Sequence, residues 1–245
     1  MPQRLGQHFL IQGGILERIA AAACPAAVDL VIEIGPGKGS LTEKLLKRAN
    51  RVVAIEVDRD LVEHLRRKFD GERRLEIVHA DILQTDLAKW GRAPIAGNLP
   101  YYIASPILEK AVRLDTPRAV FLIQKEVAQR LIARPGSREY GYLTVQTALF
   151  ADVRLLFEVK PNAFLPPPKV DSAAVLLEPR VGDLDLPDPD AFLRFVSHCF
   201  RQKRKTLRNN LAPIYGKEVI DAWPEAPLRA EKLSLQQFAD MYRRL

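Results

Sequence analysis

The chain has 245 residues, of which 47% are hydrophobic, so it can bury the core of one large α/β domain, alone or with a small second domain. Its net charge of +7 and pI of about 9.5 favour a polyanionic partner such as nucleic acid, although surplus lysines on an ordinary protein surface would give the same balance. No apolar run is long enough to span a bilayer, and no signal peptide is apparent. The two cysteines, Cys24 and Cys199, lie far apart and fit neither a disulfide framework nor a zinc motif. These observations predict a reduced, cytoplasmic location and no metal.

Short apolar runs alternate with helical patterns up to about residue 180. The strands predicted in chain order span residues 30–34, 51–56, 75–81, 94–98, 119–123, 153–159 and 172–177, and amphipathic helices are predicted over 19–27, 40–48 and 60–69. Alternation of this kind is typical of an α/β fold, in which helices cover both faces of a mainly parallel sheet. The pattern therefore predicts one α/β domain over residues 1–180.

The composition changes after Glu178. Residues 181–190 are rich in Asp, Pro and Gly and are predicted to form a linker. Beyond them the pattern is helical only, with one helix predicted over 191–211 and shorter helical pieces as far as Leu245. We therefore expect a small all-helical domain over residues 191–245.

A glycine-rich loop directly follows the first strand and precedes a helix. Its sequence is Glu33-Ile34-Gly35-Pro36-Gly37-Lys38-Gly39, in which the glycines allow a tight turn and a close approach of the backbone to a ligand. The GxGxG spacing differs from the GxGxxG dinucleotide fingerprint, and no GK[ST] follows, which excludes a P-loop. A glutamate two residues ahead of Gly35 suits a cationic, phosphate-free ligand such as a sulfonium amino acid, so we predict that Gly35 and Gly37 line a site for such a cofactor.

Two further carboxylates stand at strand ends. Glu56 ends the second strand, where a carboxylate can accept hydrogen bonds from both ribose hydroxyls, and Asp81 closes the third strand, where it can accept one from an adenine amine. With Glu33 they make three acids at the carboxyl ends of successive strands, the edge at which open α/β sheets bind ligands. The alternative is that these acids only cap the helices that follow.

The run Asn98-Leu99-Pro100-Tyr101 follows the fourth strand and is suited to adenine chemistry. Adenine N6 is a poor nucleophile, because its lone pair is delocalised into the ring. Two acceptors at the amine protons, the Asn98 side-chain oxygen and the Leu99 carbonyl, would direct that lone pair toward a methyl group. Pro100 fixes the turn, and Tyr101 offers a ring on which an extruded base stacks. The alternative is an ordinary strand-to-helix turn with a packed tyrosine.

A basic run lies near the end of the helix predicted over 191–211. It consists of Arg201, Lys203, Arg204, Lys205 and Arg208. On a helix these side chains would spread over more than one face and several could meet phosphates at once, so we predict an RNA-binding surface. The alternative is a solvated basic face without a partner.

These motifs, with several others, resemble the KsgA family, the ribosomal RNA adenine dimethyltransferases of the small subunit. The resemblance covers almost the full length and rests on Gly6-Gln7-His8-Phe9-Leu10, Glu33-Ile34-Gly35-Pro36-Gly37, Glu56-Val57-Asp58-Arg59, Gly97-Asn98-Leu99-Pro100-Tyr101, Gln124-Lys125-Glu126-Val127, Tyr140-Gly141, Phe164-Leu165-Pro166-Pro167-Pro168-Lys169-Val170-Asp171-Ser172 and Lys203-Arg204-Lys205-Thr206-Leu207-Arg208-Asn209-Asn210-Leu211. The proline-flanked and C-terminal motifs are more specific than the glycine loop.

The resemblance implies a class I, Rossmann-like methyltransferase sheet of seven strands with a small C-terminal helical domain. It also implies an enzyme that uses S-adenosylmethionine to dimethylate N6 of two adjacent adenosines near the 3′ end of 16S rRNA, with the immature small subunit as partner. The cofactor contacts that it implies are His8, Leu10, Gly35, Glu56, Asp81 and Asn98. Phe164 would pack on the target adenine opposite Tyr101. We expect a monomer that transfers the methyl group directly, by positioning and electrostatics, without a covalent intermediate.

The chain departs from the family pattern at a few positions. The family often has Asn in place of His8 and of Tyr102, so we expect a different side-chain contact at the first position and a different pocket wall at the second. A basic N-terminal extension common in the family is reduced here to Arg4, so we expect little RNA binding by this end.

Two other functions compete with this one. The first is a large-subunit rRNA adenine methyltransferase of the macrolide-resistance type, against which Leu99 and the basic run from Lys203 to Arg208 argue. The second is a ribosome-assembly or transcription factor that keeps the fold without catalysis. Intact Glu56, Asp81 and the Asn98–Tyr101 run argue against it.

Overall fold

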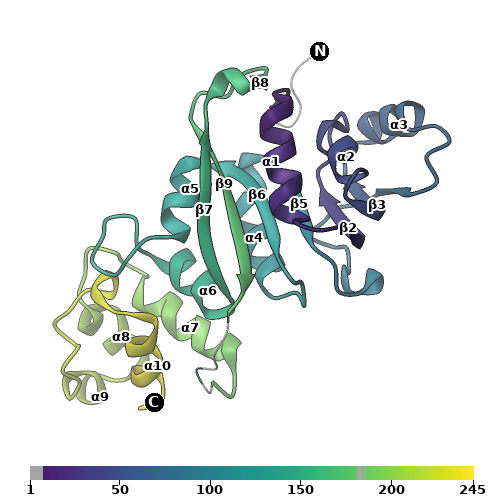
Figure 1. The fold of residues 1–245 in the computed structure, drawn as a ribbon. Helices are drawn as coiled ribbons and strands as arrows, with labels where there is room; N and C mark the ends of the chain where they lie inside the picture. Colours follow the sequence, from purple (N-terminus) through teal and green to yellow (C-terminus); the bar gives the residue numbers. More distant parts are fainter. Residues whose placement is uncertain (1–7, 181–183, 185) are drawn as a thin grey trace. The chain divides into compact units, whose positions relative to one another are not determined.

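The computed structural model describes residues 8–180, 184 and 186–245 (Figure 1). Gly6, Gln7 and Arg4, and residues 181–183 and 185 of the predicted linker, lie outside the described residues. The described residues form two compact units, which we call the sheet unit and the helical unit. The sheet unit comprises the chain up to Ala128 and Ala151–Pro179, and the helical unit comprises Gln129–Phe150 and the chain from Arg180 onward.

This division differs from the predicted one, which assigned all of residues 1–180 to the α/β domain. Residues Gln129–Phe150 group with the C-terminal helices instead. The physical reason is burial, because Tyr140 and Val145 belong to the same buried cluster as Phe192. No helix was predicted in this segment, and periodicity along the sequence does not say which core a helix joins.

The sheet unit is built on a seven-stranded sheet in the order β4-β3-β2-β5-β6-β9-β7. Its strands are β2 (Val28–Ile34), β3 (Ala49–Glu56), β4 (Leu75–His79), β5 (Ile95–Asn98), β6 (Ala119–Gln124), β7 (Ala151–Val159) and β9 (Ser172–Pro179). The pairs from β4 to β6 are parallel, and β9 is antiparallel to both of its neighbours. The prediction of a mainly parallel sheet with these seven strands is confirmed.

The helices of the sheet unit begin and end where the sequence supplies caps or breaks. They are α1 (Gly13–Ala23), α2 (Ser40–Leu45), α3 (Arg59–Lys68), α4 (Ala104–Val112) and α5 (Lys125–Leu131), of which the last crosses into the helical unit. Asp58 caps α3 by accepting from the amides of Asp60 and Leu61. The helix predicted over 19–27 instead ends at Ala23, because Pro25 cannot extend it.

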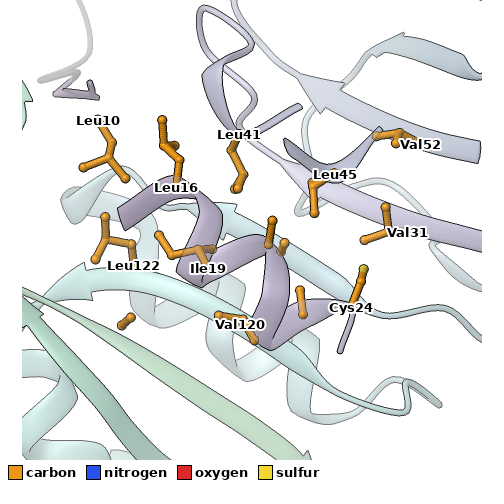
Figure 2. Close-up of a cluster of buried hydrophobic side chains, with 14 of the residues drawn as sticks. Leu10, Leu16, Ile19, Cys24, Val31, Leu41, Leu45, Val52, Val120 and Leu122 are labelled. Atoms are coloured by element: carbon orange, nitrogen blue, oxygen red, sulfur yellow. The ribbon is translucent and has the colours of Figure 1, made fainter. Parts of the chain in front are cut away.

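Helix α1 packs against both the sheet and the helix that follows the glycine loop, through a buried apolar cluster. Leu16 and Ile19 of α1 lie beside Val120 and Leu122 of β6 and Leu41 of α2 in one buried cluster (Figure 2). Burying side chains of this size is worth roughly 1.5–3 kcal/mol each. The cluster therefore holds the loop between β2 and α2 at a fixed place on the sheet.

A short ribbon outside the main sheet was not predicted. It pairs β1 (Phe9–Leu10) with β8 (Phe164–Leu165) in antiparallel register, Phe9 opposite Leu165 and Leu10 opposite Phe164. Strands of two residues carry no detectable periodicity, and their residues are more than 150 positions apart in sequence.

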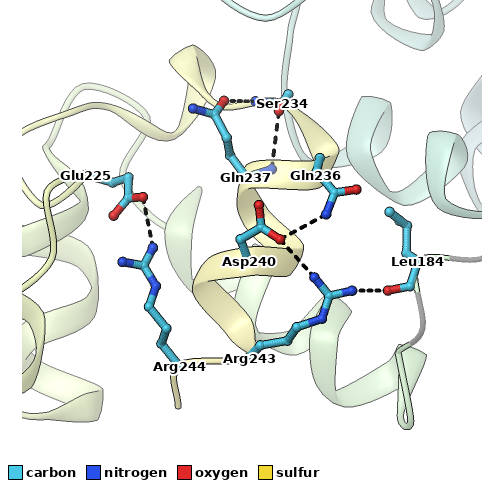
Figure 3. A network of polar contacts seen from close by, with 8 residues as sticks. All are labelled: Leu184, Glu225, Ser234, Gln236, Gln237, Asp240, Arg243 and Arg244. Carbon is cyan, nitrogen blue, oxygen red and sulfur yellow. Dashed lines mark hydrogen bonds and ion pairs between the residues drawn. The ribbon is translucent and has the colours of Figure 1, made fainter.

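The helical unit contains α6 (Tyr142–Phe150), α7 (Pro189–Cys199), α8 (Leu207–Tyr215), α9 (Lys217–Asp221) and α10 (Leu235–Tyr242). Polar contacts secure its C-terminal helix (Figure 3). Ser234 and Gln237 form a capping box at the start of α10, and Arg243 donates to Asp240 and to the carbonyl of Leu184. The end of α10 is therefore tied to the chain that leads into α7. No helix in the described part of the chain is both long and apolar enough to cross a bilayer.

The helix predicted over 191–211 is interrupted, which is a correction to the prediction. Helix α7 ends at Cys199 and α8 begins at Leu207, where the Thr206 side chain accepts from the amide of Asn209. The Asn210 side chain donates to the Cys199 carbonyl at 2.8 Å, which satisfies a carbonyl at the end of α7, and to the Gln202 carbonyl in the connection at 3.3 Å. The basic residues between 201 and 205 therefore lie in a connection and not on a helix.

Candidate active site

A cavity of about 310 Å³ opens at the carboxyl ends of β2, β3 and β5 in the sheet unit. Strand β2 stands at the point where the strand order reverses, with β3 on one side and β5 on the other, and open α/β sheets bind ligands at such a point. The cavity is lined by residues predicted for cofactor and base binding: His8, Leu10, Gly35, Gly37, Glu56, Asp81, Asn98, Leu99, Pro100 and Tyr101.

The glycine loop adopts a backbone that only glycine accommodates without strain. Gly35, Gly37 and Gly39 have φ values of 67°, 56° and 80°. A Cβ on Gly37 would lie 3.1 Å from the Phe9 ring, and one on Gly39 would lie 2.6 Å from the Phe69 ring. The loop is thus packed from outside while its inner side lines the cavity.

Glu56 is buried and held by three backbone amides. Its Oε2 accepts from Gly37 at 3.1 Å, and its Oε1 accepts from Val57 and Asp58 at 2.9 and 3.0 Å. Burial raises the pKa of Glu56, and these amides oppose the shift. A carboxylate offers about four acceptor positions, so this one keeps capacity for hydroxyl donors while its orientation is fixed.

Glu33 lies beneath the loop and is only 1% exposed. Its Oε2 accepts a hydrogen bond of 2.6 Å from the Thr42 hydroxyl, and the residue lines the cavity. Burial, together with the nearby charge of Glu56, raises the pKa of Glu33 to about 8. A cation bound in the cavity would favour its ionised form.

Asp81 stabilises the turn after β4 and also faces the cavity. Its Oδ1 accepts from the amide of Leu83 at 2.9 Å, which stabilises the turn after β4. The residue is half-buried and lines the cavity, and no hydrogen bond reaches its Oδ2 from residues that the structure describes. The second oxygen is therefore open to a ligand.

The corner after β5 has a defined orientation. The Asn98 side-chain nitrogen donates to the His8 carbonyl at 3.0 Å, and because a carbonyl only accepts, the amide oxygen of Asn98 is left as an acceptor. The Leu99 amide donates to the Leu122 carbonyl on β6 at 3.0 Å, and Pro100, with φ −58°, starts the turn Tyr101–Ile103. These hydrogen bonds hold in place two neighbouring acceptors, the Asn98 side-chain oxygen and the Leu99 carbonyl.

Tyr101 is held from two sides. Its hydroxyl shares a hydrogen bond of 2.6 Å with the buried Ser172, and its ring lies 5.7 Å from the His8 ring, centroid to centroid. Burial raises the pKa of Tyr101, so the hydroxyl stays protonated over the ordinary range of pH. The ring is a fixed wall of the cavity.

Phe164 does not reach the cavity in this structure. It is 3% exposed and packs in the buried cluster that also contains Leu10, its partner in the β1–β8 ribbon. Alternate residues of a strand face opposite sides, so it is Leu165 that points outward. The predicted stacking of Phe164 opposite Tyr101 is therefore not brought about by this arrangement.

The five predicted RNA-binding residues all belong to the helical unit, whereas the cavity belongs to the sheet unit. Arg201, Lys203, Arg204 and Lys205 are exposed in the connection between α7 and α8. Arg208 on α8 forms an ion pair of 2.7 Å with Asp221, and the Lys203 ammonium donates to the Arg138 carbonyl.

Several cavity residues were missed in the sequence. Val57 and Ile82 each follow one of the predicted acids directly and supply apolar walls beside Glu56 and Asp81. This repeated acid–aliphatic pair at strand ends was a signal that the sequence contained. Phe9 also lines the cavity, but only the packing of β1 reveals it, whereas Tyr102 lines the cavity as the sequence predicted.

The strand order, with β9 running against the others, and the loop and acids at the switch point define a Rossmann-like methyltransferase fold. A dimethyladenosine transferase from Plasmodium falciparum shares it with a TM-score of 0.81 and 27% identity over 96% of each chain. The 23S rRNA methyltransferase ErmE shares it with a TM-score of 0.71 and 28% identity, over 97% of this chain and 99% of the other.

The sequence comparison is more specific. Residues 2–245 match the model of the ribosomal RNA adenine dimethylase family. The ribosomal RNA small subunit methyltransferase A of Gloeobacter violaceus is 43% identical over 256 aligned positions, covering 99% of this chain and 93% of the relative. The chain belongs to the ribosomal RNA adenine dimethylase family. The predicted fold class, family and enzyme class are confirmed.

Proposed function

We propose that this protein uses S-adenosylmethionine to dimethylate N6 of two adjacent adenosines near the 3′ end of 16S rRNA, acting as a cytoplasmic monomer on the immature small subunit. The observation that carries this proposal is the Asn98 corner. The amide nitrogen is committed to the His8 carbonyl, so the side-chain oxygen stands beside the cavity as an acceptor next to the Leu99 carbonyl.

Different residues of the cavity suit different parts of S-adenosylmethionine. Glu56 would accept from the ribose hydroxyls, and Asp81 Oδ2 from the adenine amine, with Val57 and Ile82 against the faces of the adenine. The methionine part would lie by the glycine loop, above the Glu33 carboxyl. The sulfonium supplies an electrophilic methyl group when the cofactor is bound.

The chain's own residues supply positioning at the acceptor nitrogen. Asn98 Oδ1 and the Leu99 carbonyl would accept the two N6 protons and so draw the lone pair out of conjugation with the ring. Tyr101 would stack on the extruded base, a contact worth about 1–3 kcal/mol. The N6–C bond forms as the C–S bond breaks, and the surplus N6 proton passes to solvent. Such a step needs no covalent enzyme intermediate.

The choice of the small subunit rests on the relatives. The 43% identical protein is named a small-subunit methyltransferase, whereas the large-subunit methyltransferase ErmE is 28% identical. The exposed cations between 201 and 205 suit a polyanionic substrate but do not distinguish the two subunits.

The test uses the purified protein, labelled S-adenosylmethionine, and immature small and large subunits in parallel. Mass spectrometry of rRNA fragments should show two adjacent dimethyladenosines in 16S rRNA only. Label in the large-subunit RNA would favour the macrolide-resistance type of activity. Absence of label in both would favour a factor that has lost catalysis, and Asn98→Ala serves as the inactive control in each arm.

A further inference from the structure

Three large apolar side chains are exposed on the sheet unit beside the cavity. Ile11 is 55%, Tyr102 60% and Leu165 59% exposed. We call these three residues the apolar rim. Tyr102 itself lines the cavity. Exposed apolar groups gathered at the entrance of a site commonly mark a contact surface for a partner.

The β1–β8 ribbon directs two rim residues away from the core. Leu10 and Phe164 form one cross-strand pair and are buried, whereas Phe9 and Leu165 form the next pair and face the other side. Leu165 is paired with Phe9, which lines the cavity. Ile11 is two residues beyond Phe9 and shares this outer face. β8 lies in the connection between β7 and β9, at one end of these strands (Figure 1).

The rim has a firm support. The Ile11 amide donates to the Ala163 carbonyl at 2.9 Å, and His8 Nδ1 donates to the Pro166 carbonyl at 2.8 Å. Tyr102 follows Tyr101, whose hydroxyl is bonded to Ser172. The side chains on this support can press against a partner without first being ordered, which lowers the entropic cost of binding.

Two exposed lysines suit a nucleic acid, one close to the ribbon in space and one close to Leu165 in sequence. The Lys38 ammonium lies 4.7 Å from the centroid of the Phe9 ring, and exposed Lys169 follows Leu165 by four residues. No ion pair of either lysine is present among the described residues. An ammonium group near exposed apolar side chains suits a phosphate next to a base.

An adenosine can present N6 to the Asn98 corner only after its base leaves the stack. Extrusion leaves the neighbouring bases exposed and costs a few kcal/mol, and proteins commonly offset this cost with apolar side chains placed against the open step. We propose that Leu165 and Tyr102 pack against the bases that flank the target adenosine and hold the extruded state open. This inference rests on the proposed function and adds to it a contact with the substrate outside the methyl-transfer site.

The test compares four single variants with the wild type on immature small subunits. Leu165→Ala and Tyr102→Ala remove the rim side chains, and Leu165→Met and Tyr102→Phe keep an apolar body of similar size. We expect each alanine variant to lower kcat/KM for methyl transfer about tenfold, in the range expected when one base loses its stacking partner, and the conservative variants to stay within about twofold of the wild type. A fifth variant, Leu245→Ala, is the control: it removes an apolar side chain that is 50% exposed from the helical unit and should have no effect.

The Kd for S-adenosylmethionine, measured by calorimetry, separates the rim from the cofactor site. It should remain within about twofold of the wild-type value in all variants, because the rim is proposed to touch RNA and not the cofactor. If the Kd for the cofactor rose as much as kcat/KM fell, the rim would merely enclose the cofactor. If both alanine variants kept the wild-type rate, the rim would not touch RNA. Either result overturns this inference and leaves the proposed function standing. A wild-type protein that methylates neither subunit would overturn the proposed function and this inference together.

Discussion

The cavity of the sheet unit and the basic connection of the helical unit are built in opposite ways. Glu33 and Glu56 accept hydrogen bonds from residues elsewhere in the chain, and Asn98 donates one to a distant carbonyl. Arg201, Arg204 and Lys205, in contrast, are exposed, and none makes an ion pair with residues that the structure describes. Methyl transfer needs acceptors placed to within a fraction of an ångström, whereas attraction to RNA phosphates needs charge more than geometry. Changes in the cavity should therefore affect the chemistry steeply, and changes in the connection should affect binding gradually.

The largest effect is expected at the Asn98 corner. Asn98→Ala removes an acceptor aimed at N6, and loss of one such preorganised group typically lowers a rate by about 100- to 1000-fold. Single-turnover methyl transfer at saturating cofactor measures this. The cofactor Kd serves as the control and should change little. A variant that turns over at nearly the wild-type rate would contradict the lone-pair mechanism.

The next effect is expected at Glu56. Glu56→Ala removes hydrogen bonds that a charged acceptor would make to the ribose and leaves three backbone amides without their acceptor. Charge-assisted hydrogen bonds contribute about 1.5–3 kcal/mol each, so the cofactor Kd should rise about 100-fold. Calorimetry reports the Kd, and the thermal midpoint of the cofactor-free variant shows whether the loop still folds. An unchanged Kd would refute the ribose contact.

A smaller and different effect is expected in the basic connection. Replacing Arg201, Arg204 and Lys205 together by alanine should raise KM for the small subunit about tenfold, with kcat and the cofactor Kd unchanged, because three cations that attract RNA phosphates are removed. The dependence of log KM on log salt should also become less steep, by about 0.7 for each phosphate that the variant no longer neutralises. Arg208→Ala is the matched control, because Arg208 is already paired with Asp221 and should matter less. Equal salt slopes for all proteins would show that this segment does not meet phosphates.

The smallest effect concerns stability and pH at Glu33. Its pKa is raised in the folded chain to about 8, from an ordinary value of 4.5. The stability that depends on a neutral Glu33 is therefore complete below pH 4.5 and is lost as the pH rises toward 8. Glu33→Gln keeps an acceptor for Thr42 and does not titrate, so without cofactor it should gain stability over the wild type on the order of 1–3 kcal/mol between about pH 5 and about pH 8.

Urea unfolding of both proteins at the two ends of that pH range measures the gain, and the comparison cancels groups that titrate in both. A difference between the proteins that is the same at the two pH values would show that Glu33 does not change its charge in this range.

The parts of the site that could be predicted are local in sequence. The seven strands, the loop from Glu33 to Gly39 and the run from Asn98 to Tyr101 follow from periodicity, backbone chemistry and spacing within short windows. Glu56 and Asp81 were found because a parallel sheet brings the carboxyl ends of its strands to one edge. Periodicity, turn chemistry and strand ends each depend on a few neighbouring residues or on one strand. Predictions made from them therefore hold however the side chains pack in the rest of the fold.

The class of fold, the family and the acids, glycines and corner residues that line the cavity follow from the sequence alone. Three other features depend on contacts between distant parts of the chain. The Asn98 amide is oriented by the His8 carbonyl, 90 positions away in sequence, and Phe164 is buried while Leu165 faces outward. Asn210 closes the end of α7 before the basic residues. The difference comes from the distance along the chain over which each kind of interaction acts. Backbone preferences and periodicities are set by near neighbours, whereas the direction of a side chain and the end of a helix depend on which distant groups satisfy its hydrogen bonds and fill the space beside it.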